Sequence, residues 1–174
     1  MMLEFARHVR QRWYLYTPLA AIWMLALVRL FFDPAPRLPL LFNVTPSLPY
    51  TVALMRGRDR PIHRGDFVVY SYEGGAVRYF PGLWRQPFFK QVGGVAGDRI
   101  TVRERHVCIN GVDAGYAKTH TSERHLALEP IGATVIPPGW FYMQGSSPDS
   151  FDSRYSINGL VPARAIIGVV TPLF

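Results

Sequence analysis

The sequence has a single cysteine, Cys108, among its 174 residues. One cysteine excludes an internal disulfide framework and any zinc site built from several thiolates. Cys108 lies in an apolar, strand-like run, where a small buried hydrophobic residue is the simplest interpretation. The five histidines show no metal-binding spacing, because His120 and His125 are five residues apart and would not share a helical face. We therefore expect no metal ion and no cofactor.

Charged residues are also scarce, at 18% of the chain against 49% apolar residues. This balance predicts a folded protein with an unusually apolar surface or a membrane segment, and it argues against disorder. The net charge is +7, but the arginines are scattered from Arg7 to Arg164 without a run of five or six basic residues. Nucleic acid is therefore not expected as a partner.

One long apolar stretch, residues 13–32, is long enough to cross a bilayer at 1.5 Å per residue. Basic residues precede it, which predicts a cytoplasmic segment at 1–12 and an exported remainder. Arg29 lies near the far end, where its side chain can reach the interface. A cleavable signal peptide is disfavoured because the Asp-Pro-Ala-Pro at 33–36 is a poor cleavage site. A buried core helix is disfavoured because apolar residues surround the helix. We expect a transmembrane anchor within a lipid bilayer.

Beyond a proline-rich linker at 33–40, the pattern is typical of a mainly β domain at 41–174. Each proline disfavours helix in the residue before it, so the linker is expected to be extended. Runs of β-branched and aromatic residues predict strands at 66–72, 99–103, 107–109, 112–113, 133–136, 140–143 and 165–170. Asn110-Gly111 is a favoured hairpin turn. The expected fold class is a single mainly β domain with one N-terminal transmembrane helix.

A serine peptidase needs a nucleophile, a base and an oxyanion hole. The sequence has no Gly-x-Ser-x-Gly motif, and none of its histidines has a recognisable catalytic setting. A lysine can act as the base where burial pulls its pKa toward neutrality. The chain has two lysines, Lys90 and Lys118. Lys90 follows Phe88 and Phe89, which leaves two interpretations, a desolvated base or a surface lysine; Lys118 is interpreted as an exposed charge.

Three sequence blocks resemble the signal peptidase I family and occur in the family's order. Residues 43–49 (Asn-Val-Thr-Pro-Ser-Leu-Pro) are similar to its nucleophile box. Residues 88–98 are similar to its base box, with Gln91 in place of the family's arginine. The third block joins a Pro-Pro-Gly strand at 137–143 to the Ser-Phe-Asp-Ser-Arg signature at 150–154. The Asn-x-Thr-x-Ser-x-Pro form is most like the conjugative-transfer branch, which matures pilins.

This resemblance implies a role for each matching residue. Ser47 would attack the scissile carbonyl, and neutral Lys90 would accept its proton. The Ser47 N–H and the Thr45 hydroxyl would form the oxyanion hole. Support for the base and its loop is expected from Ser150, Asp152 and Arg154, although local sequence alone also allows a surface ion pair for the last two. Residues expected to contact the substrate are Val44, Leu48, Phe88 and Phe89.

The resemblance further implies a serine endopeptidase of the bacterial inner membrane, which cleaves a membrane-tethered preprotein or prepilin on the periplasmic side. Two alternatives are a general signal peptidase for secretory preproteins and a non-catalytic anchored β module of a transfer apparatus. A self-cleaving repressor relative would share a Ser–Lys dyad, but it needs a DNA-binding motif where the apolar stretch stands. An aromatic cluster, Tyr79, Phe80, Leu83 and Trp84, is open to two interpretations, contact with the bilayer or core packing.

Overall fold

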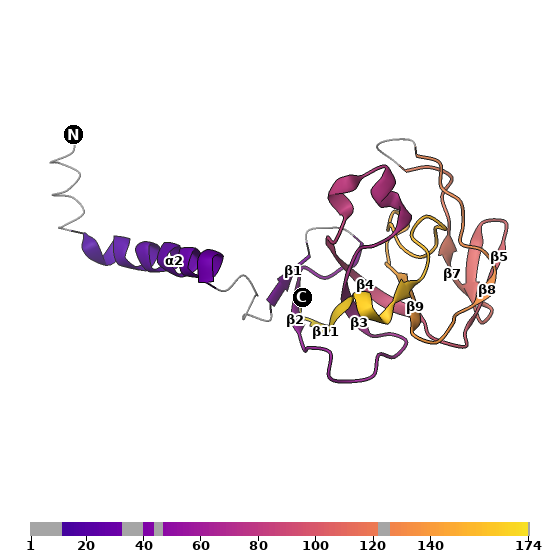
Figure 1. The fold of residues 1–174 in the computed structure, drawn as a ribbon, viewed down its shortest axis with the longest axis horizontal. Coiled ribbons are helices and arrows are strands. Elements are labelled where there is room, and N and C mark those ends of the chain that lie inside the picture. Colours follow the sequence, from indigo (N-terminus) through magenta and orange to yellow (C-terminus); the bar gives the residue numbers. More distant parts are fainter. Residues whose placement is uncertain (1–11, 33–39, 44–46, 122–125, 174) are drawn as a thin grey trace. The chain divides into compact units, whose positions relative to one another are not determined.

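The computed structural model describes residues 12–32, 40–43, 47–121 and 126–173. The chain divides into two compact units, residues 1–39 and 40–174 (Figure 1). The division falls one residue before the domain start that the sequence predicts, because Leu40 already belongs to the first strand.

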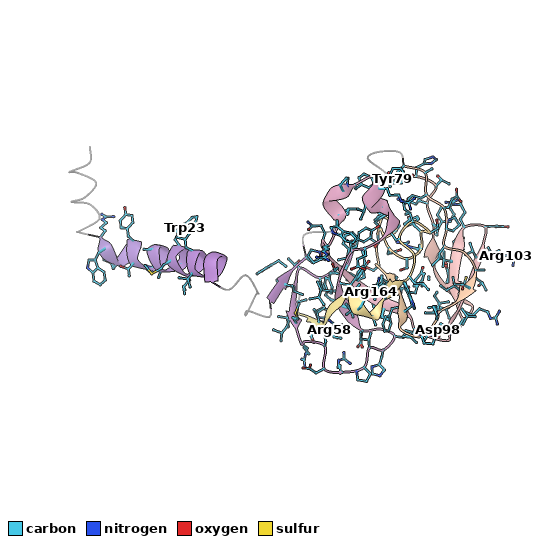
Figure 2. All side chains as sticks on the ribbon, viewed as in Figure 1. Trp23, Arg58, Tyr79, Asp98, Arg103 and Arg164 are labelled. Carbon is cyan, nitrogen blue, oxygen red and sulfur yellow. The ribbon has the colours of Figure 1, made fainter. Side chains whose placement is uncertain are left out.

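The N-terminal unit contains helix α2, which spans Trp13–Phe32, the range that the sequence predicts to be helical. Its apolar side chains are exposed by 48% to 67% at Ile22, Trp23, Met24, Leu25, Leu27 and Val28. Trp23 projects from the helix into open space (Figure 2). Within the described residues no helix is both long and apolar enough to cross a membrane. The predicted membrane span is therefore unconfirmed.

The second unit is built on a seven-stranded sheet with strand order β1-β2-β11-β3-β4-β9-β10. All its neighbouring strands are antiparallel. The strands are β1 (Leu40–Phe42), β2 (Val52–Met55), β3 (Phe67–Ser71), β4 (Pro87–Gly94), β9 (Trp140–Gln144), β10 (Val161–Pro162) and β11 (Ile166–Pro172). The sheet thus places the last strand, β11, between β2 and β3, and it places β4 between β3 and β9.

A smaller sheet has strand order β7-β6-β5-β8. Its strands are β5 (Arg99–Arg103), β6 (His106–Ile109), β7 (Val112–Tyr116) and β8 (Thr134–Val135). Asn110 and Gly111 connect β6 to β7 with φ angles of 51° and 84°. Both values lie in the left-handed region that a type I′ hairpin turn requires, so the predicted hairpin is confirmed.

The mainly β class is confirmed, and every strand predicted from sequence has a counterpart at nearly the same residues. Strand β4 was not among the predicted strands, and neither were the short strands β1, β2 and β10. Their two to four residues are too few to show an alternating pattern, and they form because neighbouring strands offer hydrogen-bonding partners.

The segment that follows β9 packs against two apolar cores. One contains Val68, Val92 and Met143, and the other contains Ile100, Ile136 and Tyr142. The half-buried side chains of Phe151 and Ile157 pack against both cores. The Ser-Phe-Asp-Ser-Arg signature is consequently fixed in place by packing on either side of it.

The aromatic cluster lies on two short 3₁₀ helices, η1 (Gly75–Arg78) and η2 (Pro81–Leu83), and on the residues beside them. Phe80 and Leu83 pack against the first core. Tyr79 and Trp84 are 57% and 51% exposed, and Figure 2 shows Tyr79 at the outer surface. Core packing is therefore the correct interpretation for half of the cluster, and bilayer contact by the other half stays a prediction.

Candidate active site

Lys90 lies on the buried face of β4. Residues two apart in a strand point to the same side, so Lys90 shares this face with Phe88 and Val92. Its register partner in β3 is Val68, and its own side chain is buried, with the residue only 3% exposed. The interpretation of Lys90 as a surface lysine is therefore wrong.

Burial changes the acid–base behaviour of Lys90. Loss of solvent lowers its pKa from 10.5 to about 8, while the Asp152 carboxylate acts to raise it and the Arg154 guanidinium to lower it. The ring centroid of Phe88 lies 5.9 Å from Nζ, a cation–π contact that is made by the ammonium form. Because burial lowers the pKa, a large fraction of Lys90 is neutral in mildly alkaline solution, as a general base must be.

Ser150 is hydrogen-bonded to this lysine. Lys90 Nζ donates to Ser150 Oγ over 2.9 Å, and Ser150 is only 2% exposed. The Ser150 N–H donates in turn to the carbonyl oxygen of Ser147 at 3.0 Å. Because this turn is itself held by backbone bonds, Ser150 fixes the direction in which the Lys90 amine points.

Asp152 and Arg154 form a buried ion pair directly after Ser150. The Arg154 Nε donates to Asp152 Oδ1 and its Nη2 to Oδ2, both at 2.9 Å, and the residues are 1% and 4% exposed. Burial by itself lowers the pKa of Arg154, but the hydrogen-bonded carboxylate raises it overall. The pair is therefore an internal brace and not the surface ion pair that local sequence also allows.

The brace extends into the backbone of the same loop. Arg154 Nη2 donates to the carbonyl oxygens of Ser147 and Ser150 at 3.0 and 3.1 Å. The Gly145 N–H donates to Asp152 Oδ2 at 2.9 Å. One ion pair thus fixes both ends of the loop that presents Ser150 to Lys90.

Ser47 is half-buried and lies in the connection between β1 and β2. Its carbonyl oxygen accepts hydrogen bonds from the backbone N–H groups of Ser146 at 2.9 Å and Ser147 at 3.3 Å. The Ser146 hydroxyl donates to the same oxygen at 3.4 Å. The backbone of the predicted nucleophile is therefore held by the loop that also orients the predicted base.

Gly145 makes this arrangement sterically possible. A Cβ at position 145 would lie 2.2 Å from Ser150 Oγ and 2.7 Å from the carbonyl oxygen of Ser47. Backbone and a buried hydroxyl cannot retreat from such contacts at low cost. The absence of a side chain at Gly145 thus allows the two predicted catalytic segments to approach the same loop.

A groove of about 460 Å³ is lined by both Ser47 and Lys90. Its other polar contributors are Asn43 and Gln86. The apolar lining consists of Leu41, Phe42, Val69, Leu83, Pro87, Phe88, Phe89 and Phe151. A hollow of this size, apolar except near a hydroxyl and an amine, suits a few small or apolar residues of a polypeptide.

The structure places only some of the predicted substrate contacts in the groove. Phe88 and Phe89 line the groove. Leu48 is only 5% exposed and is not part of the lining, because its side chain is packed inward beside Ser47. Val44 and Thr45 lie outside the described residues, so their expected contacts to substrate and oxyanion stay predictions.

Sequence reasoning did not assign a role to Asn43, Gly145 or Phe151, and it interpreted Leu83 only as a member of the aromatic cluster. The Gly145 signal was present, since a glycine stands before the serine-rich turn 146–147. Leu83 and Phe151 gave no local signal because they reach the groove only through tertiary packing. In the described part of the chain, no three side chains of the kinds that bind metals are clustered.

Comparison with known proteins assigns the chain to a family. The family model described as signal peptidase, peptidase S26, matches residues 10–174, and the chain therefore belongs to this peptidase family. It is 28% identical over 144 residues to the conjugal transfer protein TraF of Agrobacterium fabrum, which covers 76% of this chain and 80% of that protein. Among solved structures it is similar to a signal peptidase I from Enterococcus faecalis V583, with 21% identity and a TM-score of 0.40 over 64% of this chain and 98% of that one.

Proposed function

We propose that this chain is a serine endopeptidase in which Ser47 is the nucleophile and Lys90 the general base. The observation that carries the proposal is the shared groove, which is lined by half-buried Ser47 and by buried Lys90. Membership of the peptidase S26 family supports the class of reaction. The hydrogen bond from Lys90 to Ser150 supports the role of the base, because a proton acceptor must be held in a defined direction.

The first step is attack by Ser47 Oγ on the scissile carbonyl carbon. Neutral Lys90 accepts the hydroxyl proton as the new C–O bond forms. With a pKa of about 8, half of this lysine is neutral at pH 8, against roughly 0.3% for a lysine of ordinary pKa. Burial thus supplies a base at near-neutral pH without a histidine.

The tetrahedral intermediate carries its negative charge on the former carbonyl oxygen. We assign its stabilisation to the Ser47 N–H and to the Thr45 hydroxyl, by resemblance to the family. The Lys90 ammonium then gives its proton to the leaving amine, the C–N bond breaks, and an acyl-enzyme on Ser47 remains. Water, deprotonated by the same lysine, hydrolyses the ester and regenerates the free serine.

The proposed substrate is a membrane-tethered prepilin of a conjugative-transfer system. The similarity to a conjugal transfer protein over 144 residues supports this branch, as does the Asn-x-Thr-x-Ser-x-Pro form of residues 43–49. The apolar lining of the groove supports small or apolar residues next to the cleaved bond.

We further propose that the enzyme acts at the bacterial inner membrane with its β domain in the periplasm. The exposed apolar side chains of α2 support attachment to a lipid bilayer, since such a surface is unfavourable in water. Fractionation of cells into membrane and soluble parts tests this point separately from the chemistry, and recovery of the full chain in the soluble fraction would contradict it.

The decisive experiment compares three proteins on two substrates. The full chain and its Ser47→Ala and Lys90→Ala variants are incubated with a prepilin and with a standard secretory precursor, and the products are identified by mass spectrometry. We expect the unaltered chain to cleave the prepilin and both variants to be inactive while circular dichroism shows that they remain folded.

Each other outcome has a clear meaning. Preferred cleavage of the secretory precursor would make the chain a general signal peptidase. Full activity of either variant would remove that residue from the catalytic pair. Absence of cleavage of both precursors by the unaltered chain would favour a non-catalytic β module.

A further inference from the structure

The connection between β1 and β2 is held closed at its base by Asn43. The last paired residues of the two strands are Phe42 and Val52. Directly beyond them, the Asn43 N–H donates to the carbonyl oxygen of Thr51 at 2.8 Å. The segment that carries Ser47 thus begins and ends at a single backbone hydrogen bond.

The side chain of Asn43 adds two more bonds across this segment. Its Nδ2 donates to the carbonyl oxygen of Tyr50 at 2.8 Å and to that of Leu48 at 3.3 Å. Asn43 is half-buried and lines the groove together with Ser47. A side-chain amide with two N–H donors can satisfy two carbonyls at once, whereas a carboxylate of the same shape has none to offer.

The residues that Asn43 holds are themselves fixed. Leu48 is only 5% exposed. The Tyr50 ring meets that of Phe67 edge to face, with centroids 5.2 Å apart. Two successive carbonyls, those of Ser47 and Leu48, are therefore restrained from different directions, the first by the 145–147 turn and the second by Asn43.

We propose that Asn43 is a positioning residue for the nucleophile. Its carboxamide fixes the carbonyl groups of Leu48 and Tyr50, just beyond Ser47, and so it sets the direction from which the Ser47 hydroxyl enters the groove. The inference rests on the proposed peptidase function and adds a residue that acts through Ser47 without touching the substrate's reacting atoms.

The first test is kinetic and uses Asn43→Asp and Asn43→Ala in the full chain with a prepilin substrate. We expect kcat to fall by about 10- to 100-fold, as displaced catalytic groups commonly cause, and KM to change by less than about twofold. In Asn43→Ala, which adds no charge, the midpoint of the pH–rate profile is expected to stay at the wild-type value, whereas the new carboxylate of Asn43→Asp lines the same groove as Lys90 and is expected to raise that midpoint. An unchanged kcat per folded molecule would overturn the proposal.

A control variant separates a specific effect on catalysis from a general loss of stability. Asn110→Ala removes an amide that donates to Asp98 Oδ1 at 2.8 Å and accepts from the Arg99 N–H at 2.8 Å, in a hairpin turn of the smaller sheet. We expect this variant to lower the melting temperature but to keep the wild-type kcat. Equal losses of kcat in Asn110→Ala and Asn43→Ala would show that the effect is merely structural.

The second test does not need activity. Amide hydrogen exchange, followed by mass spectrometry, is compared between the unaltered chain and Asn43→Asp. We expect faster exchange at residues 47–51 and unchanged exchange in β5, β6 and β7. Unchanged exchange at 47–51 would overturn the role of Asn43 whether or not the chain cleaves peptides, whereas an inactive wild-type chain would overturn only the proposed function.

Discussion

Lys90 Nζ lies 2.9 Å from Ser150 Oγ, although the two residues are 60 positions apart in the sequence, and both are almost fully buried. The amine of a lysine in this position is removed from bulk water, is hydrogen-bonded to one hydroxyl group and lies against apolar side chains. This loss of solvent disfavours the ammonium form. The bond to Ser150 keeps the resulting neutral amine directed at one place, so the same surroundings set both the protonation and the orientation of the proposed base.

The pH dependence of cleavage follows from the lowered pKa of Lys90. Its active form is neutral, so kcat/KM is expected to rise about tenfold per pH unit below pH 8 and to level off above a midpoint near the pKa of about 8. Initial rates of precursor cleavage between pH 6 and pH 10 measure this profile. A midpoint near 10.5 would show that the base is not the buried lysine.

The same shift predicts how stability depends on pH. Between pH 8 and pH 10.5 the unfolded chain binds a proton at Lys90 that the folded chain has largely lost, so the free energy of unfolding rises with pH across this window. Below pH 8 the buried ammonium costs up to about 3 kcal/mol. We therefore expect Lys90→Met to be inactive yet more stable than wild type at pH 7, with the difference shrinking toward pH 10. Urea denaturation at the two pH values measures it, and a pH-independent difference would contradict the lowered pKa.

Local sequence could not decide the state of Lys90. Its flanking phenylalanines fit a covered strand face, but they fit a surface lysine with a packed stem equally well. The burial of Lys90 is decided by β3 on one side and by the 150–154 loop on the other, and both are distant from it in sequence. The family resemblance singles out Lys90 as the predicted base because three separate sequence blocks contribute to it, whereas hydrophobic periodicity depends only on neighbouring residues.

The error at Leu48 has a similar origin. An apolar residue beside a nucleophile is a reasonable substrate contact, but the turn at Ser47 directs the next side chain inward, where it is buried. The contact between the Ser47 carbonyl and the Ser146 N–H was equally out of reach, because backbone groups leave no compositional trace. Most of the longer strands were predictable since their alternation is local, whereas the backbone contacts and the groove lining of the site were not, since tertiary packing assembles them.

Gly145 is expected to tolerate no side chain. In Gly145→Ala the new methyl group would collide with Ser150 Oγ and with the Ser47 carbonyl, displacing both proposed catalytic segments. We expect kcat/KM to fall by about 100-fold or more. Gly132→Ala is the matched control, since a Cβ there meets nothing within 4 Å, and its activity is expected to equal that of wild type. Comparable activity of the two variants would show that the loop can move away without consequence.

Breaking the buried Asp152–Arg154 pair is expected to lower the free energy of unfolding strongly. Arg154→Ala leaves a buried carboxylate without its partner and is expected to cost about 3–5 kcal/mol of unfolding free energy. Arg164→Ala breaks a pair with Glu73 in which the arginine side chain is 72% exposed, and it is expected to cost less than about 1 kcal/mol. Urea denaturation of both variants makes the comparison, and similar losses would show that burial adds nothing to the brace.

Phe42 offers a way to weaken substrate binding without altering the chemistry. It lies on the edge strand β1, lines the groove and is 71% exposed, so its ring contributes little to the folded core. In Phe42→Ala we expect KM for the prepilin to rise by about tenfold with kcat nearly unchanged, because the ring would contact the ground state and the transition state alike. Steady-state kinetics separate the two parameters, and thermal melting checks that stability is kept. A fall in kcat at constant KM would instead place Phe42 among the groups that shape the reaction itself, and the groove would then be a narrower site than its apolar lining suggests.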